Sequence, residues 1–194
     1  MSESDVDDIE EFDDSEASDE FEHYIDAMLC GGAVRVAQVA LLLLYDESRI
    51  RITRGTRRVE ILRRRPADPE QEQDWVREAA LDAIPGGGLP LKEVIAAVAA
   101  SPEVAAVADG MRDEGLLRGR GLRLTRDGRL TRRMLTEEPP ESRAGRLAVH
   151  GPAALRDTWL GEVLEDEDPD PVRLRRVRGR GFGGIGRYRG WGLG

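Results

Sequence analysis

The chain has 194 residues, 40% of them hydrophobic and 5% aromatic, and a formal net charge of −9. This length fits one domain or two small ones with residues left for tails, and the few aromatics predict an aliphatic core. The single cysteine, Cys30, excludes an intrachain disulfide and a metal cage of cysteines. Lys92 is the only lysine, and this arginine bias is typical of a GC-rich genome, which weakens arguments from arginine counts alone.

Residues 1–22 contain twelve acidic side chains and no Lys or Arg, which predicts an acidic disordered tail. The stretch lacks the basic and apolar regions of a signal peptide, and the longest unbroken apolar run, 39–45, is shorter than the roughly 18 residues of a membrane span. We therefore expect a cytoplasmic protein without a transmembrane segment. Because Val6, Ile9 and Phe12 interrupt the acids, the tail either keeps the chain soluble or docks on a basic groove.

Residues 23–62 are predicted to form helices followed by a first hairpin. A helix is expected at 21–29, a break at Gly31 and Gly32, and a buried helix across 33–48. Ile50 and Ile52 then alternate with polar residues, and the alternation resumes after a turn at 54–56, as in a β-hairpin with one apolar face. Residues 63–73 are interpreted as a linker.

Residues 74–164 are predicted to form a second unit that starts with three helices. Asp74 is the expected N-cap of the first, whose buried stripe would be Trp75, Val76, Ala79, Ala80, Ala83 and Ile84. The segment 89–101 predicts the second helix. Ser101 and Pro102 mark the start of the third, whose buried stripe would be Val104, Val107, Ala108 and Met111.

A second hairpin is predicted after the third helix, and a last helix at 153–164. The segment 121–133 alternates apolar and basic residues around Asp127-Gly128, a dipeptide typical of hairpin turns. The sequence LRLTRDGR echoes IRITRGTR of the first hairpin. We therefore expect a mostly helical α+β fold with disordered tails and winged-helix-like helix-helix-helix-hairpin units. Either the chain contains two such units in tandem, or only the second unit is winged-helix-like. In the second case, the similarity between the two hairpin sequences is due to chance.

Three runs together resemble a known group of sequences: LCGGAVRVAQVALLLLYDESRIRI, LPLKEVIAAVAASPEVAAVADGMRDEGLL and LAVHGPAALRD. They are similar to an uncharacterised actinobacterial domain family with a Gly-Gly helix, a hairpin, a Leu-Pro-Leu helix and a Gly-Leu-Leu turn. The resemblance covers roughly residues 27–165. It implies a glycine-rich tail, which is present, and for many members a membrane location, from which this chain departs because it lacks a transmembrane run. It implies no catalytic residue.

No residue pattern in the sequence points to an enzyme, a cofactor or a metal. His23 and His150 have no metal-ligand spacing, and Cys30 lies in an apolar stretch typical of an inert thiol. GRGFGG, at 179–184, matches the dinucleotide-binding pattern but leaves no room for the helix that must follow it. An enzyme centred on His150 is the third alternative, after the two given below.

Residues 165–194 form an acidic break followed by a tail rich in arginine and glycine. Arginines neutralise phosphates and aromatic rings stack on unpaired bases, so a tail that mixes the two is typical of RNA or single-stranded DNA binding. Arg51 and Arg123 on the hairpins could contact phosphates in the same way. The candidate nucleic-acid-binding residues are Arg173, Arg175, Arg176, Arg178, Arg180, Phe182, Arg187, Tyr188, Arg189, Trp191, Arg51 and Arg123.

The expected reading helix, 102–114, argues against duplex recognition. Its solvent face offers Glu103, Asp109, Asp113 and Glu114 against the single Arg112, and DNA would repel such a face. The sequence therefore predicts a non-enzymatic protein-interaction or regulatory module with an unknown protein partner. The alternative is a nucleic-acid-associated protein without sequence specificity, which uses the tail and the basic hairpins. The oppositely charged ends could also pair with each other, and this pairing would weaken with salt.

Overall fold

The computed structural model describes residues 15–62, 74–119 and 122–165, with side chains described from Glu22 onward. This part of the chain is α+β and mostly helical, as predicted. Its elements in chain order are α1 (Ser15–Asp46), β1 (Ile50–Ile52), β2 (Arg58–Ile61), α2 (Trp75–Asp82), β3 (Leu89–Pro90), α3 (Leu91–Ala99), α4 (Pro102–Asp113), β4 (Leu117–Arg118), β5 (Arg123–Leu124), α5 (Arg126–Glu137), α6 (Arg143–His150), the 3-10 turn η1 (Pro152–Leu155) and α7 (Trp159–Glu165).

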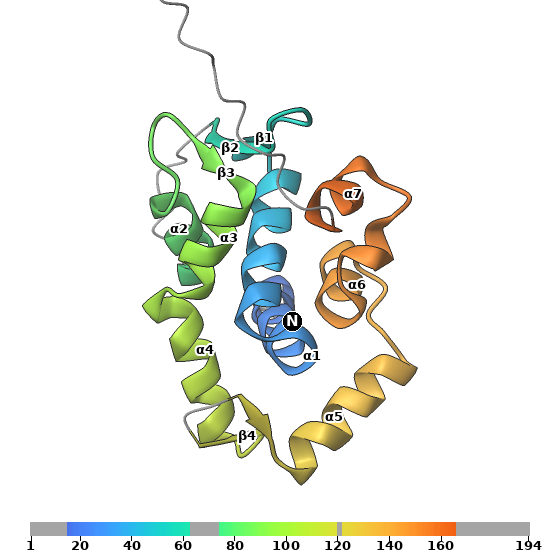
Figure 1. The fold of residues 1–194 in the computed structure, drawn as a ribbon. Coiled ribbons are helices and arrows are strands. Elements are labelled where there is room, and N and C mark those ends of the chain that lie inside the picture. Colours follow the sequence, from blue (N-terminus) through green and yellow to red (C-terminus); the bar gives the residue numbers. More distant parts are fainter. Residues whose placement is uncertain (1–14, 63–73, 120–121, 166–194) are drawn as a thin grey trace, which may run out of the picture.

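Helix α1 runs through the centre of the molecule and bends at Gly32 (Figure 1). Gly32 has φ 71°, a left-handed conformation that glycine adopts without steric cost, so the break expected at Gly31 and Gly32 is confirmed. The helix begins at Ser15, six residues before the expected start, and so includes acids assigned above to the tail. Negative charge near a helix N-terminus is favourable, which accounts for the earlier start.

The first hairpin is confirmed with the predicted register of faces. β1 pairs antiparallel with β2, with Ile50 opposite Ile61 and Ile52 opposite Val59. Ile50, Ile52 and Val59 are buried, and the exposed Arg51 forms an ion pair with Glu60 on the neighbouring strand at 2.6 Å. β3, which was not predicted, extends this sheet by pairing with β2.

The helices of the second unit start where their caps predict. The Asp74 carboxylate accepts the N–H of Arg77, and the Ser101 hydroxyl accepts the N–H of Val104, with Pro102 in the first helical position. The predicted stripe of α4 is buried in full. The prediction for α2 is wrong at Trp75, which is exposed, because the helix turns Val76, Ala80 and Leu81 inward instead.

The prediction of a hairpin turn at Asp127-Gly128 is wrong, because these residues lie in the first turn of α5. The hairpin closes earlier, with Leu117 of β4 opposite Leu124 of β5. Thr125 then acts as N-cap, its hydroxyl accepting the N–H of Gly128 at 3.0 Å. An N-cap that satisfies a free N–H of the first turn stabilises the helix at the point where a second strand was expected.

The C-terminal described region also differs from prediction. Helix α6 was not predicted, and the single helix expected at 153–164 is divided into η1 and α7. Leu155, Leu160 and Val163 are buried, as expected for that segment. α6 is packed along α1, while α2, α3 and α4 cover other sides of α1, so one hydrophobic core unites both predicted units.

Candidate functional site

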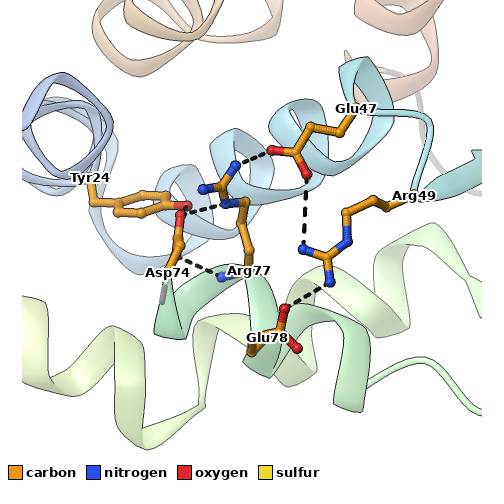
Figure 2. A network of polar contacts seen from close by, with 6 residues as sticks. All are labelled: Tyr24, Glu47, Arg49, Asp74, Arg77 and Glu78. Atoms are coloured by element: carbon orange, nitrogen blue, oxygen red, sulfur yellow. Dashed lines mark hydrogen bonds and ion pairs between the residues drawn. The ribbon is translucent and has the colours of Figure 1, made fainter. Parts of the chain in front are cut away.

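A network of polar contacts joins α2 to Tyr24 in the first arm of α1, before its bend, and to Glu47 just after its last residue (Figure 2). Tyr24, which is buried, donates from its hydroxyl to Asp74 Oδ2 at 2.6 Å. Arg77 Nε lies 2.7 Å from the same oxygen, and Arg77 Nη1 is paired with Glu47 just after α1. Side chains 50 and 30 residues apart in the sequence are thereby held at the N-terminus of α2.

Arg49 closes the other side of this network. Its Nη2 lies 2.8 Å from Glu78 of α2, and its Nη1 lies 3.9 Å from Glu47, which therefore faces two arginines. Acids and arginines alternate through the network, and Asp74 and Arg77 are only 11% and 12% exposed. Each carboxylate of the network already faces a cation or a hydrogen-bond donor. The network therefore stabilises the packing of α2 against α1, and its side chains offer no free base or nucleophile.

The surface of α5 is the most distinctive exposed feature of the described chain. Arg126, Leu130, Arg133, Met134 and Glu137 follow the spacing i, i+4, i+7, i+8, i+11, which places them on one side of a helix. We call these five residues the α5 outer face. All are exposed, Leu130 at 57% and Met134 at 61%, and Arg133 pairs with Glu137. The opposite side of the helix carries the buried Gly128 and Leu135, which is packed on the core.

The hairpin before α5 adds two further cations. Arg118 and Arg123 face each other directly across β4 and β5, and both are exposed. Directly opposed residues project on the same side of a sheet, and like charges in that position repel each other. Among the residues that the structure describes, neither arginine nor Arg126 forms an ion pair, so an external anion would relieve this repulsion. We call Arg118 and Arg123 the arginine pair.

The sequence analysis placed Arg123 among the candidates but missed the α5 outer face. The missed signal was Thr125 as an N-cap followed by apolar and basic residues at helical spacing. The other candidate in the described chain, Arg51, is already paired with Glu60. The candidates from Arg173 to Trp191 lie outside the described residues, as does the linker predicted at 63–73.

Three of the four carboxylates predicted on the solvent face of α4 are exposed, Glu103 is half-buried, and the one arginine of the helix is engaged. Asp109, Asp113 and Glu114 are exposed, while Arg112 pairs with Asp109 and donates from Nε to the carbonyl of Gly119 at 2.9 Å. Arg35 does not join it, because its Nη1 donates to the carbonyl of Leu147 at 2.9 Å at the end of α6. The two arginines therefore form no shared basic surface with α4.

A group of titratable side chains lies near the bend of α1. Burial raises the pKa of the Cys30 thiol, with the charges of Arg132 and Arg35 acting against it and that of Asp26 adding to it. Burial lowers the pKa of the Arg35 guanidinium. Burial, and then the nearby Glu22 carboxylate, raise the pKa of Asp26 from 3.8 to about 6. A thiol with a raised pKa is a weak nucleophile, which favours the structural interpretation of Cys30.

The shifted pKa of Asp26 predicts a pH-dependent stability. An acid that binds its proton more tightly in the folded chain stabilises the fold at low pH and loses this contribution as pH rises from about 4 to 6. Asp26→Asn should therefore raise the unfolding free energy at pH 7 by about 1 kcal/mol, a value reduced because the group is partly solvated. Urea unfolding at pH 4 and pH 7 measures this difference. The exposed Asp113→Asn is the control, and an equal gain in both variants would contradict the prediction.

The two histidines occupy different settings. His150, the last residue of α6, is exposed, and no described side chain donates to or accepts from its ring. His23 lies 3.2 Å from the hydroxyl of Ser142, the N-cap of α6. Within the described ranges, no three His, Cys, Asp or Glu side chains are grouped as metal ligands.

One helical segment, Glu22–Asp46, is long and apolar enough to cross a membrane, and α3 with α4, bent by 45°, would be a second candidate if counted as one span. The core helix of a soluble protein meets the same criteria, and most of Glu22–Asp46 is buried inside this fold. The cytoplasmic location and the absence of a transmembrane segment stay predictions.

Comparison of the chain with protein-family models, with curated proteins and with solved structures finds no match.

Proposed function

We propose that the chain is a non-enzymatic protein-interaction or regulatory module that contacts its partner through the α5 outer face and the arginine pair. The observation that carries this proposal is the exposure of Leu130 and Met134, one helical turn apart and bordered by arginines. Apolar side chains that gather on a surface with a charged rim are typical of protein contacts. The phosphate groups of a nucleic acid would not cover Leu130 and Met134.

The partner segment that fits this surface is acidic with apolar residues at intervals. Between Leu117 and Glu137 the sequence has seven arginines and two carboxylates, Asp127 and Glu137. Such a surface would steer an acidic partner toward it and hold the partner through its apolar side chains. The acidic surface of α4 would repel the same partner and so restrict where it binds.

Site-specific photo-crosslinking in cells tests this proposal. We expect a chain with Leu130→p-benzoylphenylalanine to form a discrete protein adduct, while the same group at the exposed Lys92 of α3 forms none. Arg126→Glu should reduce the adduct at position 130. The proposal fails if no protein adduct forms at position 130, or if Arg126→Glu leaves the adduct unchanged.

The second candidate function is nucleic-acid binding without sequence specificity. The unpaired Arg118, Arg123 and Arg126 of the described chain favour it, because they could neutralise phosphates together with the arginines at 173–189. This alternative requires that RNA or single-stranded DNA binding depends on the C-terminal tail rich in arginine and glycine.

Titration with labelled single-stranded RNA at several salt concentrations separates the two functions. For a protein-interaction module we expect no RNA binding that distinguishes the full chain from a chain ending at 171. If binding needs the tail and weakens with salt by roughly 0.7 logarithmic units per neutralised phosphate, the second candidate replaces the first.

A winged-helix-like architecture of the second unit remains part of the proposal. The order α2, α3, α4 and then the β4–β5 hairpin supports it, whereas β3 pairs with the first hairpin. The first unit has one bent helix before its hairpin, which gives the tandem alternative less support. The resemblance to the actinobacterial family likewise stays a prediction.

A further inference from the structure

We propose that residues 1–14 of the same chain occupy the α5 outer face and the arginine pair. This inference rests on the proposed function, since it concerns the same surface. It assigns that surface an internal competitor, which an acidic partner segment would have to displace.

Charge complementarity is the first argument. Residues 1–14, MSESDVDDIEEFDD, contain eight acids and no base. Elsewhere on the described chain, Arg49 and Arg77 pair with acids of the network, Arg51 pairs with Glu60, and Arg35 is bound to carbonyls of α6. Arg118, Arg123 and Arg126 form no ion pair there. The C-terminal tail has the same sign of charge as this surface and is not its occupant.

Apolar complementarity is the second argument. Val6, Ile9 and Phe12 recur at every third position among the acids. Leu122, Leu130 and Met134 are exposed on the hairpin and on α5. If Val6, Ile9 and Phe12 packed on Leu122, Leu130 and Met134, apolar surface on both segments would be removed from water. A tail that contained only acidic residues could not provide this contribution.

The start of α1 is within reach of this surface. The helix from Ser15 to Gly32 is about 26 Å long, and a Cβ built at Gly32 would lie 3.4 Å from Leu122 Cδ1. Fourteen extended residues span roughly 46–50 Å. Residues 1–14 can therefore return along α1 to Leu122 and α5. A short tether of this kind gives an effective concentration on the order of millimolar.

Photo-crosslinking within the full chain tests this contact. The probe is placed at Val6, nine residues before Ser15, because nine extended residues span roughly 30–32 Å and so exceed the distance back along α1. With Val6→p-benzoylphenylalanine, we expect an intramolecular crosslink to Leu130, Met134 or a neighbouring residue of α5, identified by mass spectrometry of the monomer. Arg126→Glu should reduce its yield roughly tenfold, the effect of reversing one charge about 6 Å from an acid in water. Lys92→Glu makes the same charge change on α3 and should leave the yield unchanged. Circular dichroism of both variants confirms that they fold.

Four outcomes would overturn the inference: a crosslink only in dimers with a yield that rises with concentration, a crosslink to residues 172–194, no crosslink to α5, or equal yields in the two charge variants. The two crosslinking experiments distinguish a failure of this inference from a failure of the proposed function. If position 130 captures a partner but position 6 never reaches α5, only the inference fails. If position 6 reaches α5 but position 130 captures no partner, only the proposed function fails.

Discussion

Gly128→Ala is expected to lower the unfolding free energy by about 3 kcal/mol, because it overpacks a position with no free space. The added Cβ would overlap the carbonyl oxygen of Leu116. That oxygen already accepts the N–H of Thr125 at 3.0 Å and its hydroxyl at 3.2 Å, so it cannot move without loss of the bonds that start α5. Thermal unfolding should show a melting temperature roughly 10 °C lower.

The matched control is Gly110→Ala in the last turn of α4. A Cβ at Gly110 meets no atom within 4 Å, and alanine favours the helix over glycine, so this variant should gain roughly 0.5–1 kcal/mol. The two substitutions are chemically identical and differ in their surroundings alone. Equal effects would mean that α5 is not seated against the β4–β5 hairpin.

Asp74→Ala is expected to cost about 3–5 kcal/mol, the range found when one member of a buried charge pair is removed. The substitution removes the cap of α2, the acceptor for Tyr24 and the partner of Arg77 in one step. Arg77 is 12% exposed and would lose the carboxylate that lies 2.7 Å from its Nε, while its ion pair with Glu47 would remain. Urea unfolding at pH 7 measures the loss.

Asp74→Asn is the matched variant, since it keeps an oxygen that can accept the N–H of Arg77 but removes the charge. We expect a loss about 1 kcal/mol smaller than for alanine, which is the usual contribution of the cap that asparagine retains. Combining Asp74→Ala with Tyr24→Phe should give a combined loss smaller than the sum, by about 1–2 kcal/mol. Strict additivity would show that the 2.6 Å contact does not couple the two residues.

Those parts of the fold that follow from local rules could be predicted from the sequence. Asp74 and Ser101 cap helices because their side chains satisfy N–H groups three residues ahead, a relation visible in any sequence window. The strand alternation at Ile50 and Ile52 is equally local. α5 was missed because two local signals compete at the same residues, the Asp127-Gly128 turn and the Thr125 cap, and the fit of Gly128 against Leu116 decides between them.

The candidate sites depend on contacts that no sequence window contains. Arg77 meets Glu47 across 30 positions, and Tyr24 meets Asp74 across 50. The α5 outer face became recognisable only once the segment was known to be helical, since as a strand its arginines and apolar residues would be on different faces. Short elements such as α6 and η1 carry too few residues for a periodic signal.

The bend of α1 makes the helix two rigid arms that share one joint. The first arm carries Tyr24, which donates a hydrogen bond to Asp74 at the start of α2, and most of the second arm is buried in the core. A Cβ built at Gly32 would lie 3.4 Å from Leu122 Cδ1, so the hairpin that carries Leu122 lies beside the bend. Any other residue at position 32 would be strained by the positive φ and would add a side chain that contacts Leu122, so one glycine serves both the direction of the chain and the seating of the hairpin.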